Sequence, residues 1–165
     1  MASTKRGGRA AVSSLLEQLD EAYDRQSWHG TNLRNSLRGL SADQALWRPV
    51  RDRHNIWEIA LHAAYWKYAA WRRLTGVKRG AFPRRGSNWI PSPVSPTGAQ
   101  WRDDVALLGD FHRKLREAVA GRGDADLQRR APGGKETVGR LVRGIAAHDL
   151  YHAGQIQLLK RLLRS

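Results

Sequence analysis

The sequence predicts an all-α protein with the architecture of a four-helix bundle. Four stretches of about 20–28 residues carry apolar side chains at steps of three and four, and no stretch alternates apolar and polar residues as a strand would. Segments rich in glycine, proline and polar residues separate these stretches. The chain of 165 residues can bury one hydrophobic core, so we expect a single domain over residues 11–165 and a disordered basic tail over residues 1–10.

The first predicted helix extends over residues 12–39. Its apolar positions recur with helical spacing and stop near Gly39. Ser41 and Gln44 follow with the spacing of a capping box, and Pro49 lies in the segment that leads to the second helix. The apolar positions of the first helix are Val12, Leu15, Leu16, Leu19, Ala22, Tyr23, Leu33 and Leu37.

The second predicted helix ends at Gly76, and a long loop over residues 76–98 follows it. This loop contains four of the six prolines of the chain, and loops of such length in compact domains are often functional. Thr97 or Gly98 opens the third helix. Thr137 begins the last helix, which runs close to the end of the sequence.

The composition excludes several kinds of site. The chain has no cysteine, so disulfides, thiolate metal ligands and thiol nucleophiles are absent, and a transition metal would need histidine, carboxylate or water ligands. No apolar run approaches the roughly 18 residues of a membrane-spanning helix. Glu17 and Asp20 interrupt the basic N-terminal segment before a signal-like apolar region develops. These features predict a soluble, cytoplasmic protein that does not enter a membrane.

The net charge of +14 is unevenly distributed, because no acidic residue occurs from Ile59 to Arg102. A positive region over residues 67–85 can attract nucleic acid or small polyanions. A solvated basic surface explains the same charge, and no helix-turn-helix spacing or RNA-binding aromatic signature favours nucleic acid. The basic residues concerned are Lys67, Arg72, Arg73, Lys78, Arg79, Arg84, Arg85 and Arg102.

The last predicted helix places two histidines within an apolar stripe. His148 and His152 are four residues apart, so their imidazoles project side by side from one face, as in helices where two histidines share a metal ion. An unpaired buried imidazole costs about 1–3 kcal/mol, which makes metal ligation a better explanation than two hydrogen-bonded core histidines. The stripe consists of Leu141, Ile145, His148, His152, Ile156, Leu159 and Leu163.

A zinc protease of the H-E-x-x-H type is excluded. Asp149 occupies the position of the glutamate in that motif, but aspartate is one methylene shorter. No histidine, aspartate or glutamate follows His152 to act as a downstream ligand. Any third protein ligand must therefore come from an earlier helix.

Spacing leaves the third ligand open. His62 lies on an apolar face of the second helix, and His112 lies on a possible stripe of the third helix. His29 could face inward if the first helix stays regular past Gly30. His54 precedes the second helix and is expected in solvent or near the helix cap. For the third ligand, the spacing places His62 first and His112 second, but it does not decide between the two.

Three segments of the chain resemble the DinB/YfiT-like family. They are LSADQALWRPVRDRHNIWEIALH, its continuation IWEIALHAAYWKY, and TVGRLVRGIAAHDLYHAGQIQLLKRLL, whose H-x-x-x-H followed by AGQI is the most specific part. The resemblance spans about residues 12 to 164. It implies a four-helix bundle, commonly dimeric, with a divalent metal held by one histidine of the second helix and two of the fourth. Carried over, the implied ligands are His62, His148 and His152.

This resemblance also implies an enzymatic activity. The family includes transferases and isomerases that use low-molecular-weight thiols, and proteins described only as metal-dependent hydrolases. Three imidazoles leave coordination positions open on zinc, nickel, copper or iron, which indicates catalysis or ligand capture. We therefore predict a metal-dependent thiol transferase or hydrolase that acts on a small molecule, as a homodimer. The alternative is a non-catalytic metal-binding or stress-response protein whose basic surface contacts nucleic acid.

Two carboxylates are candidates for a base or for orienting the imidazoles. Asp149 lies about 100° around the helix from His148, which fits a surface or neighbouring-helix contact better than catalysis. Glu58 lies one turn before His62, and its role is undecided. Gln155 could hydrogen-bond within the bundle or to a ligand. Trp28, Trp66 and Trp89 could line a pocket, although packing in the core is the commoner role.

Overall fold

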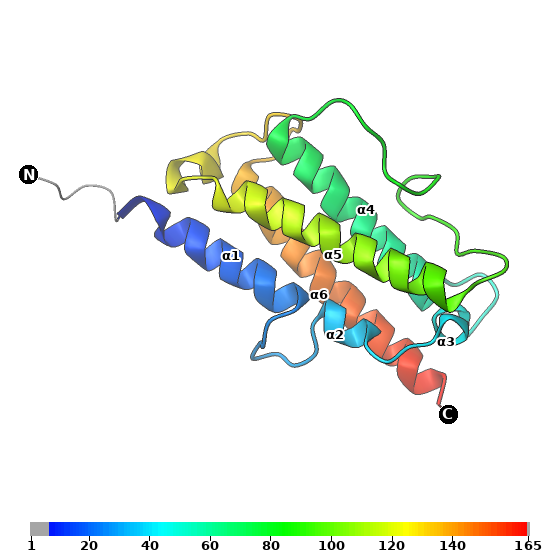
Figure 1. Cartoon of the computed structure of the whole chain (residues 1–165). Coiled ribbons are helices and arrows are strands. Elements are labelled where there is room, and N and C mark those ends of the chain that lie inside the picture. The colour runs from blue at the N-terminus through cyan, green and yellow to red at the C-terminus, as the bar shows by residue number, and fades with distance from the viewer. Residues whose placement is uncertain (1–6, 165) are drawn as a thin grey trace, which may run out of the picture.

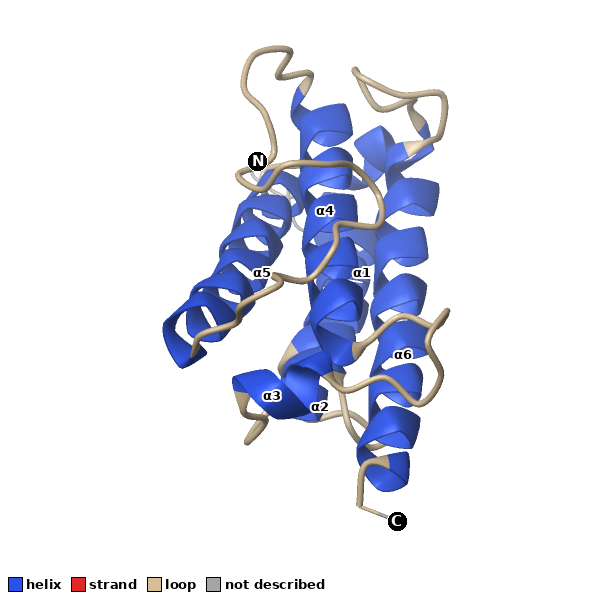
Figure 2. Ribbon diagram, turned by 90° about the vertical axis from the view of Figure 1, so that its right-hand side faces the viewer, coloured by secondary structure: helices blue, strands red, loops and turns tan. Residues whose placement is uncertain are grey.

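The computed structural model describes residues 7–164, and within this range every long element is an α-helix. Four long helices form the bundle, and two short ones cover the end at which α4 begins (Figures 1 and 2). The all-α prediction is therefore confirmed. The α-helices are α1 (Ala10–Tyr23), α2 (Leu33–Leu37), α3 (Ala42–Leu46), α4 (Ile56–Thr75), α5 (Gly98–Ala120) and α6 (Val138–Leu162).

The predicted disordered tail over residues 1–10 falls mostly on residues 1–6, which lie outside the described range. Gly7–Arg9 form a 3-10 helix that leads into α1. A second 3-10 helix, Asp124–Gln128, precedes α6. Its carboxylate Asp124 accepts hydrogen bonds from the backbone N–H groups of Ala11 and Val12, at 3.2 and 2.8 Å. This contact joins the start of α1 to the segment between α5 and α6.

The first helix is shorter than the prediction over residues 12–39. Helix α1 ends at Tyr23, and a polar turn precedes the short α2. Gly30 has a φ of 108°, which a regular helix cannot include. Asn32 then caps α2, because its side-chain oxygen accepts from the N–H of Asn35 at 3.0 Å while its amide donates to the carbonyl of Arg25 at 2.7 Å. Local turn and cap chemistry outweighs the apolar spacing here.

The other predicted boundaries are confirmed. Ser41 and Gln44 form a capping box at α3, and Thr97 forms one at the start of α5. Gly76 ends α4 in the left-handed conformation with a φ of 71°, and Thr137 caps α6.

The length of the loop between α4 and α5 follows from the topology. Helices α4 and α5 run in the same direction, so the connection travels back along the bundle before α5 can begin (Figures 1 and 2). Helix α4 has 20 residues, or about 30 Å at 1.5 Å per residue. The segment over residues 76–98 therefore passes along the outside of α4, where it can reach the side chains of that helix.

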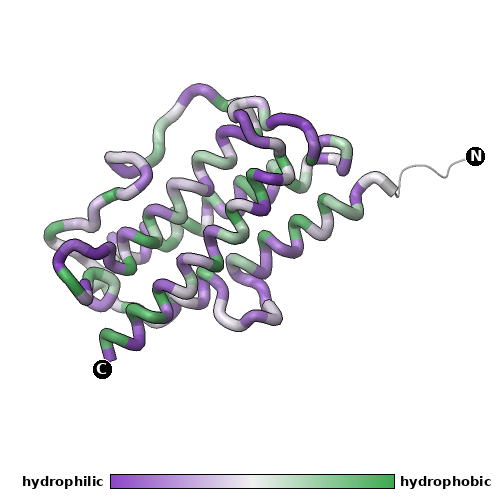
Figure 3. The backbone as a smooth tube through the Cα atoms, turned by 180° about the vertical axis from the view of Figure 1, so that it is seen from behind, coloured by the Kyte–Doolittle hydropathy of each residue, from purple (hydrophilic) through white to green (hydrophobic). Residues whose placement is uncertain are grey.

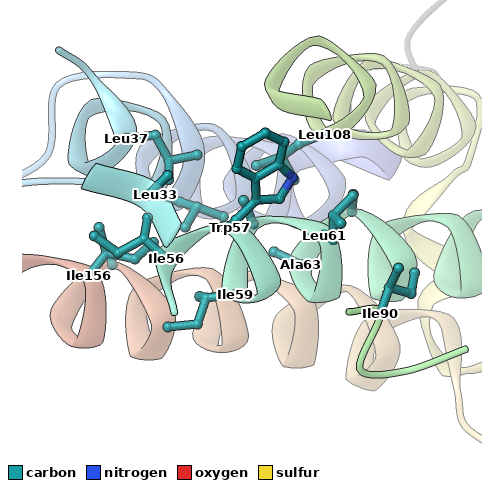
Figure 4. Packing of buried hydrophobic residues seen from close by; sticks show 14 of the residues in the cluster. Leu33, Leu37, Ile56, Trp57, Ile59, Leu61, Ala63, Ile90, Leu108 and Ile156 are labelled. Carbon is teal, nitrogen blue, oxygen red and sulfur yellow. The ribbon is translucent and has the colours of Figure 1, made fainter. Parts of the chain in front are cut away.

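The core is built from the apolar faces of the long helices. Helix α4 packs against α5 and α6, and α1 packs against α5 and α6 as well. Apolar and polar positions recur in turn along these helices (Figure 3). Trp57 is fully buried near Leu33, Leu37 and Leu108 (Figure 4), and its indole N–H donates to Asp104 at 2.8 Å. No helix within residues 7–164 is both long and apolar enough to cross a membrane.

Candidate metal centre

Three histidines from two adjacent helices meet at one point. His62 lies on α4, and His148 and His152 lie one turn apart on α6. Their ligand atoms all lie within 4.8 Å of one another. The Nε2 atom of His148 is 3.0 Å from that of His62 and 3.1 Å from that of His152. These three side chains, which we call the histidine triad, could hold a metal ion.

The hydrogen bonds around the triad determine which nitrogens carry protons. Nδ1 of His62 lies 3.0 Å from the carbonyl oxygen of Asn88, and Nδ1 of His152 lies 2.7 Å from the side-chain oxygen of Gln155. An oxygen acceptor at Nδ1 requires the proton there, so Nε2 of both neutral rings carries a lone pair. The amide of Gln155 donates to the hydroxyl of Tyr151 at 3.1 Å, while its oxygen faces His152.

His148 cannot satisfy this arrangement alone. If Nε2 of His148 carries a proton, that one proton can be donated to Nε2 of His62 or to Nε2 of His152. The lone pair of the other ring then has no good donor. Its Nδ1 is buried and has no hydrogen-bond partner within residues 7–164. A cation between the three Nε2 atoms would accept all three lone pairs, while Nδ1–H groups held by oxygens are the usual support of metal-bound imidazoles. The triad therefore fits a divalent metal.

The protonation state of the triad suits this use. Burial, together with the neighbouring imidazoles, lowers the pKa of His62 to about 4 and that of His148 to about 3. Burial also lowers the pKa of His152, against the hydrogen bond to Gln155. All three rings are thus neutral at neutral pH, which is the form that binds a metal.

Trp89 forms one wall of the site. Its indole stacks on the ring of His62 at 3.8 Å and on the ring of His54 at 3.6 Å. Nδ1 of His54 lies 2.9 Å from Glu58, which also pairs with Arg48 through both carboxylate oxygens. Burial alone would raise the pKa of Glu58, but the hydrogen bonds from Arg48 and His54 outweigh it and lower this pKa to about 2. Glu58 therefore supports the wall through His54, and none of the hydrogen bonds within residues 7–164 joins it to His62.

The loop over residues 76–98 supplies a contact that spacing did not reveal. Asn88 has a φ of 58° and is the one non-glycine residue within residues 7–164 with a positive φ. Its carbonyl faces His62, and its side-chain oxygen accepts from the indole N–H of Trp66 at 2.9 Å. The only signal in the sequence is the residue type, since asparagine tolerates this conformation better than most residues.

Asp149 lies neither at the surface nor in the triad. Its side chain is fully buried and forms an ion pair with the equally buried Lys67 of α4, so the expected contact with a neighbouring helix is the one observed. The Lys67 ammonium also lies 3.3 Å from Nδ1 of His112 and 4.9 Å from the centre of the Tyr23 ring. We call these four residues the lysine cluster. Burial raises the pKa of Asp149, and the charge of Lys67 opposes this.

The remaining candidates lie away from the triad. His29 is exposed and Trp28 is 100% exposed, so neither lines a pocket with the triad. The predicted basic region is partly engaged within the protein. Lys67 is buried, Arg72 donates to backbone carbonyls of the loop after α4, and Arg84 pairs with a carboxylate of α5 at 2.6 Å. The charge over residues 67–85 thus does not form one continuous free surface.

Comparison with known families agrees with the resemblance found in the sequence. The model of the DinB superfamily matches residues 25–156, a range that includes the whole triad. No curated protein and no solved structure matches the chain. Because the family match covers most of its length, the chain belongs to the DinB superfamily.

Proposed function

We propose that this member of the DinB superfamily binds one divalent transition metal through His62, His148 and His152, and that it is a thiol-dependent transferase. The observation that supports the metal is the convergence of three Nε2 atoms, with the rings of His62 and His152 held by oxygen acceptors at Nδ1. Zinc, nickel or iron would suit imidazole ligands. When bound, the ion would keep coordination positions open and lower the pKa of a thiol or water ligand.

A thiol is favoured as the nucleophile because neither candidate carboxylate is free to act as a base in the part of the chain that the structure describes. Within residues 7–164, the two nearest candidate carboxylates are both engaged: Glu58 by Arg48 and His54, and Asp149 by Lys67. A free thiol has a pKa of about 8.5, whereas that of bulk water is about 15.7, so the thiol needs less help to ionise. The chain contains no cysteine, so the thiol would come from a low-molecular-weight cofactor.

The protein groups around the triad have orienting and shielding roles in this proposal. Asn88 and Gln155 fix the rings of His62 and His152 through Nδ1. The stacked Trp89 covers one face of His62 and keeps water from that side. Tyr151 is 64% exposed beside His152 and marks the side from which a substrate can approach.

Spectroscopy of the cobalt-substituted protein tests this function. Addition of 2-mercaptoethanol, cysteine or glutathione should produce a sulfur-to-cobalt charge-transfer band in the near ultraviolet. The band should be absent from the His148→Ala variant and present in His112→Ala, which removes a histidine outside the triad. Hydrolysis of an ester substrate without such a band would replace the transferase by a hydrolase. Metal binding with neither property would favour a non-catalytic metal-binding or stress-response protein.

We also propose a homodimer in the cytoplasm. The support for the dimer is a pair of exposed apolar side chains on α6, Leu158 and Leu162, which lie four residues apart. Light scattering should give twice the mass of the chain, and Leu158→Lys should reduce it to that of one chain. A wild-type protein with the mass of one chain would contradict the dimer.

A further inference from the structure

A second recess lies away from the triad, between α1, α2 and α5. Helices α1 and α5 lie next to one another, and α2 lies beside the end of α1 (Figure 1). The recess has a volume of about 660 Å³, and no triad residue lines it. One face of α5, from Arg102 to Arg116, forms its longest wall, which spans about 21 Å at 1.5 Å per residue. We call this recess the α1–α5 groove.

Two side chains of the lysine cluster line the α1–α5 groove, and each has a hydrogen-bond donor that no acceptor within residues 7–164 satisfies. Tyr23 is only 3% exposed, yet its hydroxyl has no hydrogen-bond partner within residues 7–164. His112 is 5% exposed, and its Nδ1 faces the Lys67 ammonium, so this ring accepts at Nδ1 and carries its proton on Nε2. That N–H lies 3.8 Å from the nearest carboxylate oxygen, of Asp20, which is too long for a hydrogen bond.

Both side chains remain neutral at neutral pH. Burial and the charge of Lys67 together lower the pKa of His112 to about 2. Burial also raises the pKa of Tyr23 above its usual value. The groove therefore presents a neutral hydroxyl and a neutral ring N–H at its inner end, and both can donate to an acceptor.

The residues around these donors are mainly cationic. Five arginines and three aspartates line the groove, which leaves two positive charges in excess. Arg34, Arg113 and Arg116 pair with aspartates, whereas Arg102 has no acidic partner within residues 7–164. The lining arginines are Arg25, Arg34, Arg102, Arg113 and Arg116, and the aspartates are Asp20, Asp24 and Asp110.

A glycine in the middle of α5 keeps the inner donors accessible. Gly109 lines the groove, and a Cβ atom at this position would lie 3.3 Å from the Tyr23 hydroxyl. Glycine inside a helix costs about 1 kcal/mol relative to alanine. Val105 and Ala106 provide apolar surface on the same wall, one turn away.

We propose that the α1–α5 groove binds a small organic carboxylate at a site separate from the metal centre. The carboxylate group accepts from the Tyr23 hydroxyl and the His112 N–H, and the excess of arginines that line the groove favours its negative charge. The carbon skeleton lies along Val105 and Ala106. Donors without acceptors favour an anion, and the apolar wall favours an organic anion over a mineral one.

Calorimetric titration of the full chain with 4-hydroxybenzoate and succinate tests this site. At least one of the two should bind, and 4-hydroxybenzyl alcohol, which lacks the carboxylate, should not. Tyr23→Phe should weaken binding about fivefold to tenfold, the equivalent of one hydrogen bond. Gly109→Leu should abolish binding by filling the groove. His148→Ala, which alters only the triad, should leave the affinity unchanged.

Folding of the variants is an internal control. The Tyr23 hydroxyl has no partner to lose, and leucine favours a helix more than glycine does, so neither variant should unfold at a lower urea concentration than the wild type. The proposal is overturned if neither carboxylate binds at millimolar concentration. Binding that survives Gly109→Leu, or that disappears with His148→Ala, would place the ligand elsewhere and overturn it equally.

Discussion

Two buried polar clusters lie between α4 and α6, and they differ in how their charges are balanced. The lysine cluster contains its own cation, because the Lys67 ammonium pairs with Asp149 and faces the acceptor nitrogen of His112. The histidine triad brings three acceptor nitrogens within 4.8 Å of one another and includes no cation. The same two helices thus contribute to one cluster whose charges are balanced within the protein and to one that requires a cation from outside.

Removal of the internal cation should have the largest effect on stability. Lys67→Met leaves the Asp149 carboxylate buried without a partner, so we expect a loss of about 3–5 kcal/mol in the free energy of unfolding. Urea denaturation measures this. The double variant Lys67→Met/Asp149→Leu should recover most of the loss, since it removes both charges. A loss below about 1 kcal/mol in the single variant would show that the lysine cluster is not balanced by this pair.

Removal of a triad histidine should not lower the stability of the metal-free protein, in contrast to removal of Lys67. In metal-free protein, His148→Leu removes a buried nitrogen without a partner and relieves the converging lone pairs, so stability should stay equal or rise. Wild-type protein should gain about 2.7 kcal/mol when free zinc reaches a hundred times its dissociation constant, and the variant should gain nothing. Thermal unfolding with and without zinc measures both. A metal-free variant that is clearly less stable would make His148 a core residue.

The hydrogen bond to His152 should tune metal affinity. Gln155→Leu removes the acceptor at Nδ1, and the loss of such a support typically weakens metal binding about 10- to 100-fold. Gln157→Leu is a matched control on the same helix, two residues further on, and should leave the zinc dissociation constant unchanged. Competition with a chromophoric chelator gives both constants. Equal affinities in the two variants would mean that Gln155 does not orient the ligand.

The stability of the protein should also depend on pH, through the ionisation of His112. Burial lowers the pKa of His112 to about 2, below its unfolded value of about 6.5, so the unfolded chain binds the additional proton first. Its contribution is fully present above pH 6.5 and is lost as the pH falls toward 2, by at most about 1.4 kcal/mol per pH unit. His112→Phe should therefore flatten the fall in unfolding free energy of metal-free protein between pH 6.5 and 4.5. Identical slopes would contradict this.

Helical spacing and caps made much of the fold predictable. Gly76, Thr97 and Thr137 mark boundaries through local chemistry that the sequence displays directly. The i, i+4 spacing of His148 and His152 fixes their common face whatever else the chain does. The break after Tyr23 was missed, because cap and turn chemistry around Gly30 and Asn32 competes there with an apolar pattern that continues across the turn.

Contacts between distant segments could not be predicted. Asp149 was expected on the surface or against a neighbouring helix, and its depth depends on Lys67, which is 82 residues away in the sequence. The stacking of Trp89 between His54 and His62 depends on the path of the long loop along α4. Spacing within one helix carries no information about these partners, whereas the family resemblance separated His62 from His112.

Metal content tests the central claim most directly. Elemental mass spectrometry of untagged protein, after reconstitution and removal of free metal, should give one metal ion per chain. His62→Ala, His148→Ala and His152→Ala should each lose it, while His112→Ala should retain it. An empty wild-type protein, or metal retained in the three triad variants, would contradict a centre held by the histidine triad.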